Sequence, residues 1–394
     1  MSLVQAAFES LARRLPKTEL HLHIDGSLSP EFILRRASAR GVSLEVSQPD
    51  QVRPMLQKRK LLQIEGGNKQ EKGGNWGIFD FCNQFLQSRD ELREATSDIL
   101  CRLSAKQVRL CELRFCPSLH CLEGLTEKEA VEAVLEGFAE ARQKIVETGS
   151  SIEGGVIVCA LRSFPEAHAV EMAELAAEFL QSKPGVCGFD VAGDEGNYPL
   201  SGMMKGVLHA KKLGVPVTVH AGEWPVNEKF GDNSLNNLRL ALDSHAVARI
   251  GHGIQLHRDS HLMDQCKEGG IFVECCLTSN VGWKVPSYHE HPIRQMLEHG
   301  IKVTLNCDNL LLSGTLENEA DPTQEVMHFA LDVGNHIGEG MTLNHLRDVL
   351  HNGADAAFIF HNWDVEEANA WRTAYKEEVD RILEDFKAEM DLLM

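Results

Sequence analysis

A short segment near the N-terminus, ELHLHIDG at residues 19–26, combines side chains that could bind a metal ion. Successive side chains of a β-strand point to opposite faces, so a strand here would place His21, His23 and Asp25 on one face and the apolar residues on the other. A single histidine in an apolar strand is usually a hydrogen-bonded core residue, and one H-x-H pair is only moderately specific for a metal. The pair becomes informative when further ligands end other strands.

Three later apolar runs end on such residues, at His220, His252 and Asp308. Imidazole nitrogens and carboxylate oxygens suit Zn²⁺ at catalytic sites, where one coordination position stays open for water or substrate. Glu223 follows shortly after His220 and would lie in the next loop. A loop glutamate is usually a solvated charge, but beside a metal it becomes a candidate proton carrier. These residues therefore indicate a zinc-dependent hydrolase.

Eight short apolar or β-branched runs, each ending near polar residues, predict the strands that would position these groups. Strands that alternate with helices of crossover length form parallel sheets. We therefore predict a (β/α)₈ barrel, whose functional groups gather at the carboxyl ends of the strands. An open Rossmann-type sheet is the alternative, although no G-x-G-x-x-G follows the first strand. The predicted strands are Thr18 to Asp25, Val108 to Phe115, Gly155 to Leu161, Gly188 to Ala192, Val215 to His220, Arg249 to His252, Ile271 to Cys275 and Ile301 to Asp308.

The connection from Gly26 to Gln107 is too long for a simple crossover, so we expect extra helices there, over the mouth of the barrel. Its Ser29-Pro30-Glu31 start and Gly41 are typical of a helix with an N-cap, a first-turn proline and a terminating glycine. Four aromatic residues in this connection are spaced to lie on one face of a helix. That face would either only pack the lid helix against the barrel or, in addition, close an apolar substrate pocket. No repeat or linker divides residues 1–394, which predicts one domain with a lid insertion at about 26–107. The residues spaced to form the aromatic face are Trp76, Phe79, Phe81 and Phe85.

The chain has 394 residues and a formal net charge of -19, which repels phosphate backbones and anionic lipids. We therefore expect no nucleic-acid or membrane partner. The first twenty residues hold no sustained apolar stretch, so we expect no secretory signal and a cytoplasmic location. Eleven cysteines, an odd number in apolar surroundings, indicate reduced core thiols rather than a disulfide framework.

Seven segments follow one another along the chain as Thr18 to Ser27 (TELHLHIDGS), Glu112 to Pro117 (ELRFCP), Gly188 to Glu195 (GFDVAGDE), Val219 to Glu223 (VHAGE), Arg249 to Gly253 (RIGHG), Cys276 to Asn280 (CLTSN) and Val303 to Asn309 (VTLNCDN). Together they closely resemble the adenosine deaminase family. The ordered set covers nearly all eight predicted strands and is highly specific. The resemblance implies hydrolytic deamination of a purine nucleoside with one zinc ion as the cofactor.

The resemblance also implies roles for particular residues. Zinc would generate hydroxide near neutral pH for attack on C6 of the purine. His252 would accept or orient the proton of the attacking water. Glu223, in its acid form, would protonate purine N1 before ammonia leaves. The zinc ligands would be His21, His23, His220 and Asp308.

Substrate contacts are implied in the same way. Asp25 would accept a hydrogen bond from a ribose hydroxyl, His23 would also face the substrate, and the backbone at Gly193 would approach purine N3, where a side chain would interfere. Family members often carry two successive acids after the last strand, whereas this chain has Asp308 followed by Asn309. The second position is expected to donate to purine N7, and an asparagine amide donates at any pH. We therefore expect activity to survive, with an altered pH profile or base selectivity.

Adenine deaminases and deaminases of adenosine monophosphate or its N6-modified forms share much of this site and are the alternatives. Asp25 favours a neutral sugar hydroxyl and would repel a 5′-phosphate, and free adenine would leave it without a partner. We therefore predict adenosine and 2′-deoxyadenosine as substrates, giving inosine or deoxyinosine. A nucleoside-binding protein without turnover would be expected to lack Glu223, His252 or a metal ligand, and none is missing.

Overall fold

The computed structural model describes residues 3–65, 77–180, 184–282, 284–315, 320–333 and 341–393. Its eight strands form one sheet whose spatial order follows the chain from β1 to β8, and all seven neighbouring pairs are parallel. Every strand predicted from the sequence is present. The strands are β1 Lys17–His23, β2 Val108–Phe115, β3 Glu153–Leu161, β4 Val186–Ala192, β5 Val217–Ala221, β6 Arg249–His252, β7 Phe272–Cys275 and β8 Lys302–Leu305.

The sheet closes on itself between β1 and the segment that follows β8. Asp308 N donates to the carbonyl of His21 at 2.9 Å, and His23 N donates to the carbonyl of Asp308 at 2.9 Å. A side chain crosses the same seam, because Asn306 Oδ1 accepts from Leu20 N at 2.9 Å. The (β/α)₈ barrel is therefore confirmed, and the open-sheet alternative is wrong.

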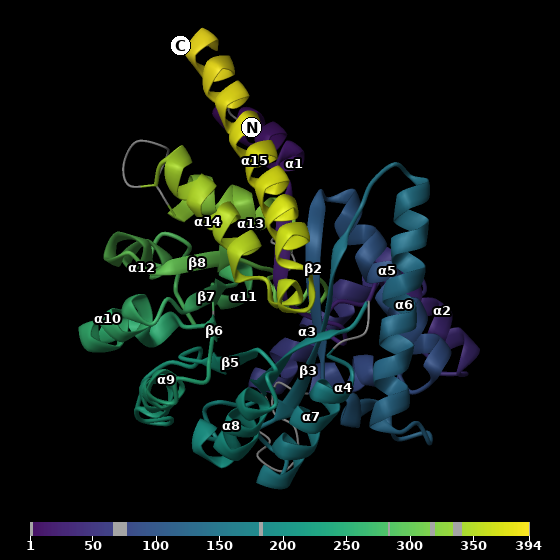
Figure 1. The fold of residues 1–394 in the computed structure, drawn as a ribbon. Coiled ribbons are helices and arrows are strands. Elements are labelled where there is room, and N and C mark those ends of the chain that lie inside the picture. The colour runs from purple at the N-terminus through teal and green to yellow at the C-terminus, as the bar shows by residue number, and fades with distance from the viewer. Residues whose placement is uncertain are drawn as a thin grey trace.

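Helices surround the strands (Figure 1), and each crossover after β2 contains at least one. These helices are α6 Glu127–Glu147, α7 Glu166–Glu178, α8 Met204–Lys212, α9 Asn233–Asp243, α10 Ser260–Glu268, α11 Leu277–Asn280 and α12 Ile293–His299. Helix α1 (Leu3–Arg14) precedes β1. Three further helices follow β8, namely α13 Pro322–Met327, α14 Leu343–Ala356 and α15 Val365–Leu393. Helices α1 (Leu3–Arg14) and α15 lie side by side in both views, and the rings of Phe8 and Phe386 pack edge to face with centroids 5.0 Å apart.

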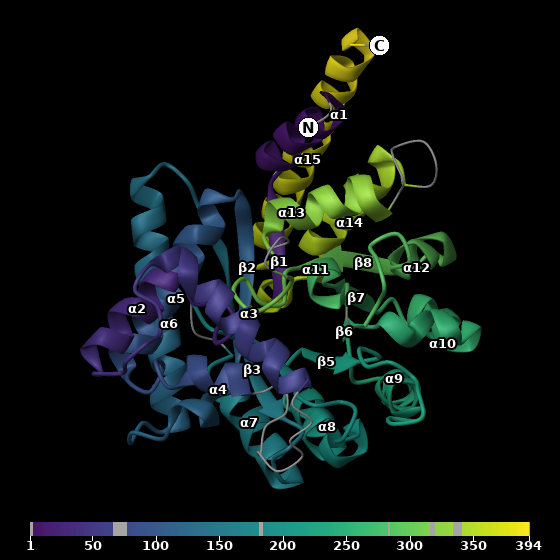
Figure 2. The same cartoon turned by 180° about the vertical axis from the view of Figure 1, so that it is seen from behind.

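Four helices occupy the connection between β1 and β2: α2 Pro30–Ala39, α3 Pro49–Glu65, α4 Gly77–Asn83 and α5 Arg89–Ala105. Helix α2 begins as predicted, since Ser29 Oγ accepts from Phe32 N at 3.3 Å as its N-cap. Arg53 of α3 donates to the carbonyls of Leu311 at 3.0 Å and Ser313 at 2.7 Å, in the segment after β8. The insertion therefore packs against the carboxyl end of the barrel, and Figure 2 shows α3 in front of the strands.

The aromatic face predicted for this insertion is present only in part. Phe79 and Phe81 lie on α4 and are half-buried. Phe85 is buried but lies beyond the helix, because the chain turns after Asn83, with Phe85 N bonded to the carbonyl of Cys82. Trp76 lies outside the described residues. Closure of a substrate pocket by this face stays a prediction.

All eleven cysteines lie within the described residues and are free thiols, and only Cys101 and Cys121 are not fully buried. This agrees with the expectation of reduced core residues. Among the described helices, none is long and apolar enough to cross a membrane.

Candidate active site

Four polar side chains meet where β1, β5 and β8 end, and their ligand atoms all lie within 4.8 Å of one another. His23 Nε2 is 3.2 Å from His220 Nε2 and 3.5 Å from Asp308 Oδ1. His21 Nε2 is 3.6 Å from the same Asp308 oxygen. Imidazole nitrogens and a carboxylate oxygen are donor types that catalytic zinc accepts. The structure thus brings the four predicted ligands together.

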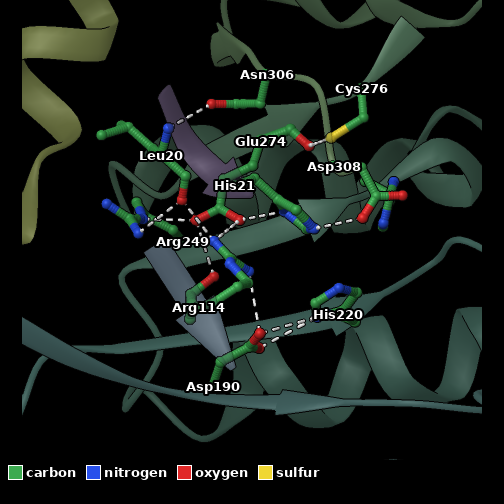
Figure 3. Close-up of polar contacts among 12 residues, drawn as sticks. Leu20, His21, Arg114, Asp190, His220, Arg249, Glu274, Cys276, Asn306 and Asp308 are labelled. Carbon is green, nitrogen blue, oxygen red and sulfur yellow. Dashed lines mark hydrogen bonds and ion pairs between the residues drawn. The ribbon is translucent and has the colours of Figure 1, made fainter. Parts of the chain in front are cut away.

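The ring of His21 tests whether this cluster fits a metal ion. Its Nδ1 lies 2.7 Å from Glu274 Oε2, so Nδ1 carries the hydrogen and the lone pair is on Nε2. That Nε2 is buried and has no hydrogen-bond partner among the described residues. A buried nitrogen lone pair without a partner is unfavourable, and a metal ion at the centre of the cluster would satisfy it. Figure 3 shows the His21 ring between Glu274 and Asp308.

Two carboxylates that the sequence analysis did not single out hold the ligand histidines from behind. Glu274 of β7 contacts His21, and Asp190 of β4 lies 3.1 Å from His220 Nδ1. Arg114 joins the two carboxylates, at 3.0 Å from Asp190 Oδ2 and 2.9 Å from Glu274 Oε2 (Figure 3). Carboxylates in this position fix the tautomer of a ligand histidine and present its other nitrogen to the metal.

Each carboxylate of this buried network pairs with an arginine inside the barrel. Arg249 pairs with Glu274 Oε1 and with Glu112 Oε2, each at 2.6 Å, and all these side chains have an exposed fraction of 0%. Burial by itself would raise the pKa of Asp190, but His220 and the Arg114 guanidinium outweigh burial and hold that pKa well below its usual value. The carboxylates behind the histidines are therefore ionised hydrogen-bond acceptors.

The predicted proton carriers lie beside the cluster. His252, at the end of β6, places Nε2 at 3.3 Å from Glu223 Oε1. The same Glu223 oxygen accepts from the ammonium of Lys284, a residue that the sequence analysis missed. Ligand atoms of Glu223, His252 and Asp308 lie within 4.8 Å of one another, so both carriers adjoin the metal cluster.

The loop that carries Glu223 is held by another carboxylate, Glu195. Its two oxygens accept from three successive backbone amides, Gly222 at 2.7 Å, Glu223 at 2.8 Å and Trp224 at 3.0 Å. Asn237 Nδ2 donates to it at 3.0 Å. Glu195 is fully buried, so the direction of the Glu223 backbone is fixed from within the protein.

Two residues of the site have backbone conformations that side chains rarely adopt. His252 has φ 64° and Asp308 has φ 65°, both in the left-handed region. Such conformations persist where the surrounding structure over-determines them, which is common at functional sites. At Asp308 the bridge to β1 fixes the backbone, and Ser279 Oγ donates to Oδ2 at 2.6 Å.

The three further residues expected to contact substrate also lie at strand ends. Asp25 is buried, accepts a hydrogen bond from Asn83 of α4, and has no partner on Oδ1 among the described residues. Gly193 follows β4 with φ 102°, a backbone conformation that favours glycine. A Cβ at this position would make only ordinary contacts, the nearest at 3.5 Å, so the conformation and not lack of space favours glycine here. Asn309 is buried with Nδ2 3.4 Å from Ser313 Oγ. Their contacts with a substrate stay predictions.

Residues that the sequence analysis did not assign a role make up most of the support for the site. Several of them lie inside the segments that resemble the adenosine deaminases, which was the one signal that could have found them. They are Arg114, Asp190, Glu195, Ser279 and Asn280. Glu274 and Lys284 lie outside those segments.

A parallel barrel with a buried metal-ligand cluster at the carboxyl ends of its strands defines a metal-dependent hydrolase of the amidohydrolase type. The family model of adenosine deaminase matches residues 16–357. An adenosine deaminase from Clostridium botulinum is 34% identical over 310 residues, which cover 77% of this chain and 84% of that protein. The chain therefore belongs to the adenosine deaminase family and is a metal-dependent hydrolytic deaminase.

Solved structures share the fold at lower identity. An amidohydrolase from Burkholderia ambifaria with bound zinc is 22% identical, with a TM-score of 0.77 over 97% of this chain and 95% of that one. The N6-mAMP deaminase from Arabidopsis is also 22% identical, with a TM-score of 0.74 over 93% of this chain and 99% of that one.

Proposed function

We propose that this protein is a cytoplasmic enzyme that deaminates adenosine and 2′-deoxyadenosine at a single zinc ion. The observation that carries the proposal is the convergence of the four ligand atoms within 4.8 Å, with the Glu223 and His252 side chains adjoining them. Such a site combines a metal with a positioned carboxyl group, which hydrolysis of an amidine carbon–nitrogen bond requires.

The donor set supports zinc as the metal. It consists of His21, His23, His220 and Asp308, and the unpartnered Nε2 of His21 faces the centre of the cluster. When bound, zinc would lower the pKa of a water molecule so that hydroxide forms near neutral pH. The structurally similar amidohydrolase from Burkholderia ambifaria holds zinc, which supports the same choice here.

The residues of this chain would then place the purine and move protons. Glu223 would deliver a proton to purine N1 while C6 becomes tetrahedral, since its carboxyl group adjoins the cluster. Asn309 would donate to N7, the backbone at Gly193 would approach N3, and Asp25 would accept from a ribose hydroxyl. His23 is the most exposed of the ligands, at 16%, which suits a side chain that also meets the substrate.

The environment of Asp25 supports a nucleoside over a nucleotide. Burial raises the pKa of Asp25 to about 6, and its Oδ1 has no hydrogen-bond partner among the described residues. A sugar hydroxyl would satisfy this oxygen, whereas a 5′-phosphate at the same position would place a second negative charge in a buried setting. A monophosphate remains the alternative substrate to test, because the structurally similar protein from Arabidopsis is an N6-mAMP deaminase.

An ammonia-release panel tests the proposal, with adenosine, 2′-deoxyadenosine, adenine, adenosine monophosphate and N6-methyl-AMP as substrates and metal analysis of the same sample. We expect the two nucleosides to have the highest kcat/KM and one zinc per chain. Glu223→Gln should lose ammonia release but keep the zinc. A preference for adenine or a monophosphate would overturn the substrate, and an inactive zinc-loaded wild type would favour a binding protein.

A further inference from the structure

A series of hydrogen bonds leads to His252 from a backbone amide, whose direction is unambiguous. Ile293 N can only donate, and it lies 3.1 Å from His291 Nδ1. His291 Nδ1 is therefore an acceptor, and the hydrogen of the neutral ring is on Nε2. Burial lowers the pKa of His291 to about 3, which keeps this ring neutral at physiological pH.

The side-chain amide of Asn280 lies between His291 and His252 and contacts both rings. His291 Nε2 lies 3.2 Å from Asn280 Oδ1, and Asn280 Nδ2 lies 3.0 Å from His252 Nδ1. Because His291 Nε2–H donates, the amide oxygen must face it, and the amide nitrogen must face His252. The exposed fractions of Asn280, His291 and His252 are 0%, 2% and 1%, so water does not compete for these contacts.

His252 consequently has one arrangement of its ring hydrogen. Its Nδ1 accepts from Asn280, so the neutral ring carries its hydrogen on Nε2, which faces Glu223 Oε1 at 3.3 Å. That oxygen also accepts from Lys284, so two donors converge on Glu223. In this tautomer Nε2 has no lone pair that could accept a proton from water, and the lone pair of the ring lies on Nδ1, which faces Asn280.

We propose that Asn280 and His291 are positioning residues that hold His252 in the Nε2–H tautomer, so that His252 donates a hydrogen bond to the attacking oxygen and does not act as a base. The inference rests on the proposed function. The proton that the attacking water releases goes to the carboxyl group of Glu223, which then delivers it to purine N1. The protons balance, because the first proton lost by water is gained by N1, and the second, on the new C6 hydroxyl, goes to the amino group that leaves as ammonia.

The tautomer of His252 is measured directly by nitrogen-15 NMR of the imidazole rings in the zinc-loaded protein. The signals are assigned by their loss in His252→Gln. We expect an unprotonated Nδ1 and a protonated Nε2 in the wild type. A protonated Nδ1 would overturn the proposal. This readout needs no turnover, whereas failure of the proposed function would show as absence of ammonia release by the same wild-type sample.

Asn280→Asp reverses the polarity of the contact with almost no change in shape. One carboxylate oxygen still accepts from His291, but the other would now accept from His252, which moves the ring hydrogen to Nδ1. At an alkaline pH where the spectrum shows a single ring hydrogen, we expect kcat to fall about 100-fold, as on loss of one preorganised donor. If His252 were a base, this variant would expose a lone pair on Nε2, so an undiminished or higher kcat would overturn the donor role.

Asn306→Asp is the matched control. Asn306 is also buried, with an exposed fraction of 1%, and its amide bonds Leu20 N and Thr304 Oγ1 rather than His252. We expect the His252 tautomer to be unchanged in this variant. A shift of the same size as in Asn280→Asp would mean that any new buried acid has this effect, which would contradict the assignment. If Asn280→Asp does not fold, the nitrogen-15 spectrum of the wild type still shows which nitrogen of His252 carries the hydrogen, and so tests the proposal.

Discussion

Glu274→Gln tests whether a carboxylate that never touches the metal sets metal affinity. Both Glu274 oxygens face donors only: Oε2 meets His21 Nδ1 at 2.7 Å and Arg114 at 2.9 Å, and Oε1 meets Arg249 at 2.6 Å and Thr218 at 3.0 Å. Whichever way a glutamine amide turns, its NH₂ group meets a donor. The hold on the His21 tautomer is therefore weakened.

The size of the effect follows from the same contacts. Loss of a carboxylate behind a ligand histidine lowers metal affinity about 10- to 100-fold, which corresponds to about 1.4–2.8 kcal/mol of binding free energy. Breaking the buried pairs with Arg114 and Arg249 also lowers the free energy of unfolding, by about 3–5 kcal/mol. Zinc affinity is measured by competition with a chromophoric chelator, and stability by urea denaturation.

Glu112→Gln separates the two effects. Glu112 is equally buried, and its oxygens also face donors only, with Arg249 at 2.6 Å and Ile359 N at 2.9 Å. It contacts no ligand histidine in the described structure. We expect this variant to lose a similar amount of stability and to keep wild-type zinc affinity. Equal zinc affinity in Glu274→Gln and wild type, or an equal loss in both variants, would refute the reasoning.

Two further outcomes are expected. 7-Deazaadenosine should lose about 1–3 kcal/mol of transition-state binding relative to adenosine, because Asn309 would be left without its acceptor, and equal kcat/KM values for the two substrates would exclude that role. Burial raises the pKa of Glu325 from 4.5 to about 7, although Leu277 N and Thr278 N donate to it. The folded protein thus binds this proton more tightly than the unfolded chain, and stability falls as pH rises through that window. Between pH 5 and pH 8 the free energy of unfolding, measured by urea denaturation, should therefore fall by about 2–3 kcal/mol less in Glu325→Gln than in the wild type. The same pH dependence in both proteins would contradict this role of Glu325.

The strands and the residues at their ends are predictable because they have local signals. Apolar runs with period two identify a strand, and a histidine or aspartate at its end lies at the mouth of a parallel barrel without further information. The sequence alone identifies His21, His220 and Asp308 in this way, and their ligand atoms do converge. The helix that starts at Ser29 is predictable for a similar reason, since its cap is local.

The support behind the site is not predictable from local signals. Arg114 and Glu274 are charged residues inside strands, and only their mutual contact, 160 positions apart in the chain, makes their burial favourable. Lys284 contacts Glu223 because of the conformation of the loop after α11, which no periodicity describes. The sequence predicts that Phe85 shares a helix face with Phe79 and Phe81, which is wrong because α4 ends at Asn83 and a turn follows. The spacing of the aromatic residues does not show where the helix ends.

The left-handed backbone at His252 and Asp308 implies a conflict between durability and activity. Glycine adopts this conformation without the steric penalty of about 1 kcal/mol that other residues pay. His252→Gly or Asp308→Gly would relax the backbone and remove the imidazole or carboxylate that the proposed reaction needs. Engineering that screens only for a higher melting temperature would thus be drawn toward variants that no longer react, so selection for heat tolerance in this protein has to include an activity screen.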